Sequence, residues 1–148
     1  MTISSISQQD AVSRLSTYLE QEHSTKDKIK TPIQVQFAAF GQSNPTLLVT
    51  DAKNEKFVVR KKPEGTLISK NSHAIEREYE IMNALFKYNQ RLPNGIKDEM
   101  AVPVPEVYCL CEDTGILGTS FYVMKFVEGR IFTDQRMLNL PKEERRQW

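Results

Sequence analysis

The sequence predicts an α+β fold, in which a five-stranded antiparallel sheet carries one main helix and a second helix lies at the N-terminus. Five short apolar segments separated by turn residues are typical of strands. Between the third and the fourth of them, one long stretch repeats apolar residues at helical spacing. The 148 residues are enough for one domain with a single modest core.

The N-terminal part predicts a short amphipathic helix followed by a linker. The helix ends near His23, and its apolar face consists of Val12, Leu15 and Leu19. Residues 24–30 are polar and basic without periodicity, and Pro32 marks the entry to extended chain. We therefore expect residues 1–31 to form an N-terminal helix and linker.

Three antiparallel strands are expected next. In residues 33–37, Ile, Val and Phe alternate with two glutamines, which is the period of a half-buried strand. A turn at 41–45 leads to a second strand at 46–50, and residues 51–55 have the composition of a hairpin turn. The third strand begins at Phe57 and ends within residues 60–63. Together the three strands predict a meander.

The main helix follows a loop. Ser72 is a natural N-cap, and a helix of roughly 17 residues is expected after it. Its apolar stripe consists of Ile75, Tyr79, Met82, Leu85 and Phe86. Its polar side carries Glu76, Arg77, Glu78 and Glu80.

The rest of the chain predicts two more strands joined by a turn. The expected order is a polar loop at 90–100, a strand at 106–111, a turn at 112–118 and a strand at 120–127, which Gly129 ends. Asp134 could cap a short helical turn, and Pro141 stands at the first position of a further helix.

Composition limits the partners and the location. The 20 Lys and Arg nearly balance the 19 Asp and Glu, so no net field attracts nucleic acid or an anionic membrane. The first twenty residues contain Asp10 and Glu20 and no apolar run, which argues against a signal or transit peptide. We expect an intracellular protein, with the cytoplasm first and the peroxisome or mitochondrion left open.

The two cysteines, Cys109 and Cys111, lie on the same face of a predicted strand. We expect reduced thiols in or near the core. A zinc pair is the weaker alternative, because nothing nearby supplies two further ligands. No other metal-ligand cluster and no Ser/His/Asp set can be defended from the sequence.

Five motifs in order resemble the small lobe of the aminoglycoside phosphotransferase family, which is kinase-like. Within that family the chain is similar to the kinase-like domain of acyl-CoA dehydrogenase family members 10 and 11. The motifs are Phe-Gly-Gln-Ser-Asn-Pro-Thr at 40–46, Phe-Val-Val-Arg-Lys-Lys-Pro at 57–63, His-Ala-Ile-Glu-Arg-Glu-Tyr at 73–79, Val-Pro-Val-Pro-Glu-Val at 102–107 and Gly-Thr-Ser-Phe-Tyr-Val-Met-Lys-Phe-Val-Glu-Gly-Arg at 118–130. The resemblance implies residues 32–130 as the small lobe and 131–148 as the start of a large lobe that is otherwise absent.

The resemblance implies a phosphate site. Its cover is the turn of Gly41, Gln42, Ser43 and Asn44, whose amides and side chains could approach phosphate oxygens. Arg60 stands where the family grips the phosphates, and Glu78 matches the partner of that cation. The alternatives are a plain hairpin connection and two surface charges.

The resemblance also implies an adenine site at the hinge after the fifth strand. The Lys125 carbonyl and the Val127 amide would meet the adenine edge, and Met124 would line the back. The family often has an acidic residue at the position of Lys125, which matters little if only its carbonyl is used. The alternative is an ordinary core strand.

The implied function is that of an ATP-dependent small-molecule kinase without its catalytic groups, and the dehydrogenase-linked branch implies a hydroxyacyl-CoA as its acceptor. The family's His-Gly-Asp base and its magnesium-binding Asn and Asp are absent from the 148 residues. We therefore expect weak ATP binding, no bound Mg²⁺ and no catalytic residues. Three readings stay open: a truncated or split phosphotransferase with a separate large lobe, a nucleotide-binding or protein-interaction module that could self-associate, and a remnant without a selected role.

Overall fold

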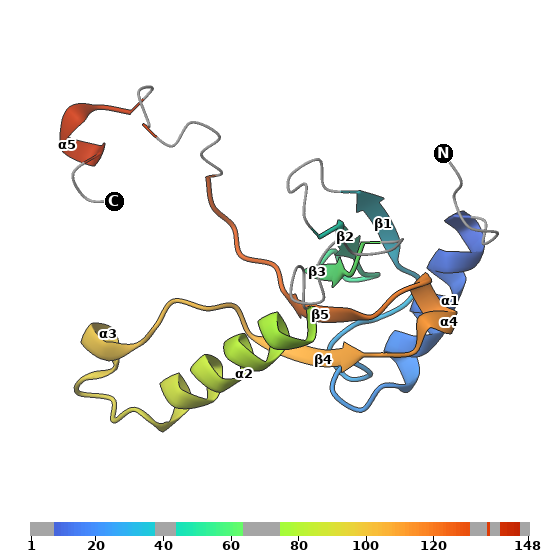
Figure 1. Ribbon diagram of the computed structural model, residues 1–148, viewed down its shortest axis with the longest axis horizontal. Coiled ribbons are helices and arrows are strands. Elements are labelled where there is room, and N and C mark those ends of the chain that lie inside the picture. The colour runs from blue at the N-terminus through green and yellow to red at the C-terminus, as the bar shows by residue number, and fades with distance from the viewer. Residues whose placement is uncertain (1–7, 38–43, 64–74, 131–135, 137–139, 146–148) are drawn as a thin grey trace.

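The computed structural model describes residues 8–37, 44–63, 75–130, 136 and 140–145 (Figure 1). Within them the chain forms five strands and five helices. In chain order these are α1 (Gln8–Gln21), β1 (Gln34–Phe37), β2 (Thr46–Thr50), β3 (Lys56–Lys61), α2 (Ile75–Arg91), α3 (Lys97–Met100), β4 (Val107–Cys111), α4 (Thr114–Leu117), β5 (Phe121–Lys125) and α5 (Lys142–Arg145).

The five strands form one antiparallel sheet in the order β1-β2-β3-β5-β4. The meander of β1 to β3 is as expected, and β5 inserts between β3 and the edge strand β4. Strand β3 therefore lies at the centre of the sheet. The predicted α+β class, with five antiparallel strands, a main helix and an N-terminal helix, is confirmed.

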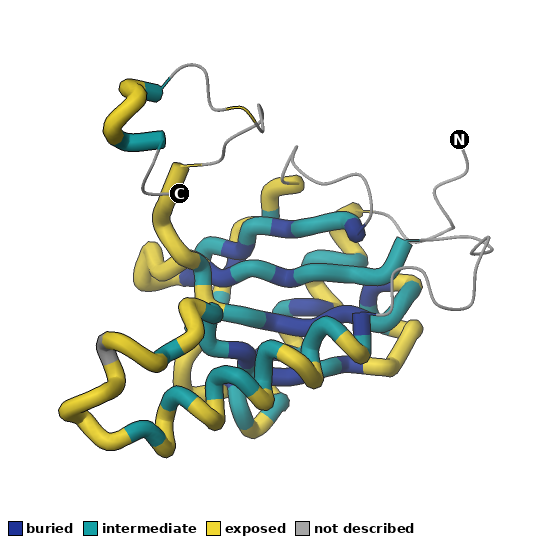
Figure 2. The backbone as a smooth tube through the Cα atoms, turned by 60° about the vertical axis from the view of Figure 1, so that its left-hand side comes forward, coloured by how far each residue is buried: buried dark blue, intermediate teal, exposed yellow. Residues whose placement is uncertain are grey.

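One face of the sheet carries the main core, and α1 covers it. Side chains that alternate along the strands point to this face, and they pack with two leucines of α1 that are each 1% exposed. Its members include Leu15, Leu19, Leu47, Val49, Phe57, Val59, Phe121 and Val123. Burying each large aliphatic side chain contributes about 1.5–3 kcal/mol, so this face accounts for most of the apolar stabilisation. Figure 2 shows the buried segments concentrated along the strands.

The described residues cover the opposite face only in part. Helix α2 packs against β4 and β5, where Ile75, Val107 and Tyr122 form a second, smaller cluster. The apolar stripe predicted for this helix is present in part, since Tyr79 and Met82 pack against that cluster. The β1 to β3 half of this face lies beside α2 rather than under it (Figure 1).

The segment after α1 is a packed turn, so the predicted linker at 24–30 is wrong. Thr25 is fully buried, and its hydroxyl donates to the Leu19 carbonyl at 2.9 Å. Ile29 is 1% exposed and donates its amide to the Thr25 carbonyl at 2.8 Å. Because Ile29 belongs to the main core, α1 and this turn share one core with the sheet. The domain boundary at residue 31 stays a sequence-based prediction.

Two predicted loops contain short helical turns. In the expected loop at 90–100, α2 continues to Arg91 and α3 follows. In the expected turn at 112–118, Asp113 caps α4 by accepting the Gly115 amide at 2.8 Å. Gly118 ends α4 with a φ of 83°, a left-handed conformation that glycine adopts without strain.

Other expectations are confirmed. The hairpin at 51–55 forms, the helix after Pro141 begins at Lys142, and both cysteines are free and buried. In the described residues no helix is long and apolar enough to span a membrane. The caps predicted at Ser72 and Asp134 lie outside the described residues.

Candidate functional site

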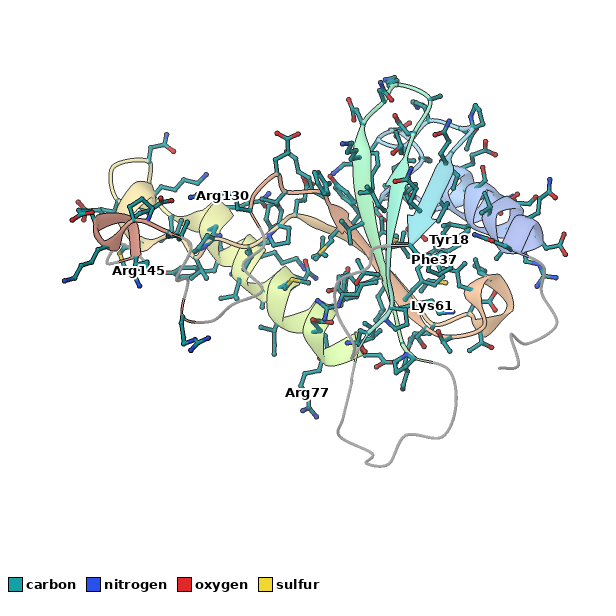
Figure 3. The ribbon with its side chains drawn as sticks, turned by 90° about the horizontal axis from the view of Figure 1, so that it is seen from above. Tyr18, Phe37, Lys61, Arg77, Arg130 and Arg145 are labelled. Atoms are coloured by element: carbon teal, nitrogen blue, oxygen red, sulfur yellow. The ribbon has the colours of Figure 1, made fainter. Side chains whose placement is uncertain are left out.

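A pocket of about 820 Å³ opens on the β1 to β3 half of the sheet, beside the chain that leaves β5. Its walls are mostly apolar. The lining residues are Gln36, Phe37, Thr46, Leu47, Leu48, Val58, Pro103, Val104, Pro105, Met124, Lys125, Phe126 and Val127. Figure 3 shows Phe37 at the end of β1, where it is 66% exposed.

The floor of the pocket is a row of side chains that runs across four strands. In the strand register Gln36 lies opposite Leu48, Leu48 opposite Val58, and Val58 opposite Met124. All four line the pocket, and we call them the pocket row. Paired residues point to the same face of a sheet. The pocket row therefore faces away from the main core, whose members occupy the alternate positions.

The segment after β5 forms one wall. Lys125 donates its amide to the Glu106 carbonyl at 2.8 Å, and Phe126 to Gly129 then run outside the sheet. Val127 is 63% exposed. The Phe126 ring lies 5.5 Å from Lys56 Nζ, a cation–π distance that ties this wall to β3. Main-chain groups outside a ladder can meet the polar edge of a ligand.

The second wall is the extended segment Pro103 to Pro105, held in place from α2. The Asn89 side chain donates to the Val102 carbonyl at 2.6 Å and accepts the Val102 amide at 2.9 Å. These two hydrogen bonds, which resemble those of a pair of β-strands, fix the start of the wall to the last turns of α2. The sequence pattern of residues 103–105 did not indicate that this segment belongs to the site.

A second row lies two residues further along β3, about 7 Å from the pocket row. It consists of Thr46, Arg60 and Tyr122, which lie opposite one another on β2, β3 and β5. Above it, Arg60 Nη1 lies 3.1 Å from Glu78 Oε1 of α2. The predicted pairing of Arg60 with Glu78 across the strand-to-helix gap is therefore confirmed.

A parallel ion pair stands beside the first. Lys62 Nζ, one residue beyond the end of β3, lies 3.8 Å from Glu76 Oε1 in the first turn of α2. By contrast, Arg77 extends away from the sheet (Figure 3). Each partner in the two pairs is about one-third exposed, and such pairs contribute about 0–1 kcal/mol. Their effect is to orient the charges more than to stabilise the fold.

The remaining predicted site residues divide into three groups. Met124, Lys125 and Val127 line the pocket. Asn44 is 7% exposed beside β2, and its side-chain oxygen is buried without a hydrogen-bond partner in the described part of the chain. Gly41, Gln42 and Ser43 lie outside the described residues. Their binding roles all remain predictions.

None of the described residues that line the pocket is Ser, Cys, His, Asp or Glu. Burial raises the pKa of Cys109 to about 12, so this thiol is protonated at neutral pH and is a poor nucleophile. Burial also raises the pKa of Cys111. Across the described ranges, no group of three His, Cys, Asp or Glu side chains could hold a metal ion.

Comparisons with known proteins point to one family. The model of the phosphotransferase enzyme family matches residues 34–148. The crystal structure of a Ralstonia eutropha protein, described as a candidate aminoglycoside phosphotransferase, superposes with a TM-score of 0.62 and 32% identity over 90% of this chain. This likeness confirms the kinase-like fold class expected from the sequence.

Two curated relatives are similar over most of this chain. The chain is 40% identical, in an alignment of 119 residues that covers 77% of its length, to the Arabidopsis thaliana protein named "Probable acyl-CoA dehydrogenase IBR3". It is 39% identical over 137 residues, or 93% of its length, to acyl-CoA dehydrogenase family member 10 of Mus musculus. The chain spans 13% and 11% of those relatives and 32% of the solved structure.

Proposed function

Since this chain belongs to the phosphotransferase enzyme family, we propose that its described residues hold the nucleotide in an ATP-dependent small-molecule phosphotransferase. The adenine occupies the apolar pocket, and the phosphates extend toward Arg60. Base, metal ligands and acceptor site come from residues outside this chain segment. The 148 residues alone bind ATP weakly and do not transfer its phosphate.

The observation that carries the proposal is the adjacency of the pocket row and Arg60. Val58 and Arg60 lie on the same face of β3, two residues or about 7 Å apart. A ligand whose flat ring lies on Val58 and Met124 therefore has its charged tail within reach of the guanidinium. Arginine is permanently charged and binds phosphate oxygens through two N–H groups at once.

The pocket has the size and composition of a small-molecule site. Such sites occupy about 300–1,000 Å³ and combine apolar walls with a few polar groups that set orientation. Here the apolar walls suit a heterocycle. The main chain at the end of β5 and just beyond it, from Lys125 to Val127, supplies polar groups for its edge.

The groups for chemistry are a separate requirement. Phosphoryl transfer depends on metal ions that neutralise developing charge and on a base that orients the acceptor. The sequence contains no His-Gly-Asp motif, and the described residues contain no metal-binding cluster. The relatives are named for acyl-CoA, which supports an acyl-CoA-type acceptor, and phosphoryl transfer to it requires that it carry a hydroxyl.

One observation favours a second function, that of a protein-interaction module. Phe37 and Val127 are both more than 60% exposed at the mouth of the pocket. A protein segment or a second copy of the chain could cover them. This occupant would compete with the nucleotide for the same walls.

Titration by NMR on the isotopically labelled chain tests the nucleotide proposal. We expect ATP and adenosine to shift signals of the pocket row, with dissociation constants near 1 mM, or roughly 4 kcal/mol of binding energy. Arg60→Ala should reduce the affinity for ATP to that of adenosine. Lys53→Ala is the matched control, because it removes one exposed positive charge at the opposite end of the same hairpin.

Three results would contradict the proposal. Signals that shift away from the pocket row would place the nucleotide elsewhere. Equal losses of ATP affinity in the two variants would show that Arg60 acts only through net charge. Micromolar, magnesium-dependent binding of ATP would contradict the claim that the chain carries an incomplete site.

A further inference from the structure

We propose that Tyr122 is a positioning residue, whose hydroxyl bridges Arg60 and Glu78 and sets the orientation in which the guanidinium meets a phosphate. The phosphate half of this inference rests on the proposed function. The bridge itself is a property of the chain without ligand, and it can be tested separately.

The sheet places Tyr122 directly beside Arg60. The two residues are opposite one another in the β3–β5 register, so their side chains leave the same face of neighbouring strands. Tyr122 is fully buried, whereas the Arg60 side chain is 32% exposed. Tyr122 therefore lies beneath the ion pair, and Arg60 reaches over it to Glu78.

The ring of Tyr122 is held by its neighbours. Ile75 and Val107 share its cluster, and the Tyr79 ring lies 6.1 Å away at 52°. Both Tyr79 and Glu78 belong to α2, so one helix packs the ring and supplies the carboxylate. The packing fixes where the hydroxyl lies without any contribution from the hydroxyl itself.

Three buried polar atoms at this point lack hydrogen-bond partners among the described residues: Arg60 Nε, Glu78 Oε2 and Tyr122 Oη. Buried polar atoms almost always have a partner, so three together need an explanation. The nitrogen can only donate, the carboxylate oxygen can only accept, and a phenol can do both. One hydroxyl that accepts from Arg60 Nε and donates to Glu78 Oε2 satisfies all three atoms.

The hydroxyl keeps the proton that this bridge needs. Burial raises the pKa of Tyr122 above its usual range, and the Glu78 carboxylate raises it further, while Arg60 partly opposes the shift. The phenol is therefore neutral at physiological pH and can donate to the carboxylate.

The bridge restricts how Arg60 can face a ligand. An ion pair that is one-third exposed leaves a guanidinium free to exchange which N–H groups it uses. When Nε contacts the tyrosine and Nη1 contacts Glu78, the Nη2 edge remains for a phosphate oxygen. Tyr122 would thus determine which edge of the Arg60 guanidinium faces the phosphate, although its hydroxyl does not touch the nucleotide.

Tyr122→Phe tests the inference, because it removes the hydroxyl and keeps the ring in its packing. In the ligand-free wild type, we expect the Arg60 Hε signal to exchange slowly with water. In the variant its exchange should become at least about tenfold faster, as expected when one hydrogen bond to a charged group is lost. The affinity for ATP should fall about tenfold while that for adenosine stays unchanged.

Tyr108→Phe is the matched control. It removes a half-buried phenol from the neighbouring strand β4, where Tyr108 contacts Phe57 and Lys28. It should leave Arg60 Hε exchange and the ratio of ATP to adenosine affinity unchanged. A Tyr122→Phe variant with the wild-type exchange rate, or a wild type in which Arg60 Hε is already unprotected, would overturn the bridge.

The two proposals can fail separately. If the wild type binds no ATP, the proposed function fails, and the exchange rates still decide on the bridge. If Tyr122→Phe does not fold, the ¹³Cζ titration of Tyr122 in Glu78→Gln replaces it, because loss of the carboxylate should lower the pKa of the phenol. An unchanged titration would overturn the bridge.

Discussion

Asp51 joins three parts of the backbone through one carboxylate. Its Oδ1 accepts the amides of Lys53 at 2.8 Å and Glu55 at 2.9 Å, which closes the β2–β3 hairpin. Its Oδ2 accepts the Lys30 amide at 3.0 Å, which ties the turn after α1 to the hairpin. Asp51 is 5% exposed, so each of these bonds is shielded from water.

We expect Asp51→Asn to destabilise the chain by about 1.5 kcal/mol at neutral pH, because an amide has one acceptor oxygen where the carboxylate has two. Burial alone would raise the pKa of Asp51, but the amides of Lys30, Glu55 and Lys53 lower it below the ordinary value of 3.8. This contribution is therefore present above pH 3.8 and is lost as the pH falls through the lowered value. Urea unfolding at pH 7 and pH 3 measures both effects.

The Asp113→Asn variant is a suitable comparison, because Asn caps a helical turn about as well as Asp. Its stability should stay near that of the wild type. A variant at Asp51 that loses as much stability between pH 7 and pH 3 as the wild type would refute the role given to its charge.

Residues of the candidate site could be predicted where the residue type, or the motif that contains it, indicates binding by itself. Arg60 and Glu78 could be chosen from charge and motif order, and Met124, Lys125 and Val127 from the resemblance of the motif at 118–130 to the family's hinge. Leu48 and Val58 were also accessible, because alternation along β2 and β3 separates them from the core positions. The wall at Pro103 to Pro105 was not, because its place depends on how Asn89 of α2 holds the distant Val102.

At the scale of elements, α1 is the principal cover of the sheet. Leu15 and Leu19 enter the core, the Tyr18 ring meets the Phe121 ring edge-on at 5.5 Å, and Arg14 Nη1 donates to the Gly115 carbonyl of α4 at 2.7 Å. Helix α1 contacts the sheet and also α4. It therefore cannot separate from the sheet without exposing the main core.

We expect Leu15→Ala to destabilise the whole chain by about 3 kcal/mol, since it leaves a cavity under a helix. Val12→Ala, at a half-buried position of the same helix, should cost less than half as much. Amide exchange should show α1 and β3 opening together. If α1 exchanges freely while β3 stays protected, then α1 is a separate appendage and the shared core has no cooperative role.

The elements that were mispredicted are all short. Four residues of α3 or α4 cannot display a helical period, so composition alone indicated loops there. In the turn at residues 24–30, Thr25 is buried by its contact with Leu19 and Ile29 by its contacts with the main core. The main core includes residues of the sheet that are far away in the sequence, so the local residue pattern does not reveal this burial. Longer elements such as α2 were predictable because 17 residues repeat the period several times.

At the scale of the whole molecule, two large apolar side chains remain exposed at the mouth of the pocket. Phe37 and Val127 are the most exposed large apolar side chains of the described residues. Contiguous apolar patches favour association with another surface. In a two-lobed kinase-like protein, the large lobe would cover the apolar residues from Phe126 to Leu140. Of these, Phe126 and Leu140 are half-buried in this chain, and Ile131, Phe132, Met137 and Leu138 lie outside the described residues.

We expect the chain to self-associate as its concentration rises, with Phe37 at the contact. Phe37→Gln should weaken this association and change the free energy of unfolding by less than about 0.5 kcal/mol, because the side chain is already 66% exposed. Light scattering over a concentration series provides the measurement. Ile81→Gln, which replaces an apolar side chain 54% exposed on α2, is the control.

Saturating adenosine should also weaken the association, because ligand and partner use the same walls. A chain that stays monomeric at high concentration would remove the basis for this expectation. An equal effect of Phe37→Gln and Ile81→Gln would show that general surface hydrophobicity, and not the pocket mouth, drives association.

Alternate residues of each strand point to opposite faces of the sheet, and the two faces have different neighbours. Odd-numbered and even-numbered residues of β3 can therefore be changed for different purposes. Along β3, Phe57 and Val59 contact the main core, whereas Val58 and Arg60 face the pocket and α2. Substitutions on opposite sides share no partners, so their free energies should add. An engineer could therefore randomise Leu48, Val58 and Met124 to search for new ligands, while independently repairing any lost stability from the α1 side.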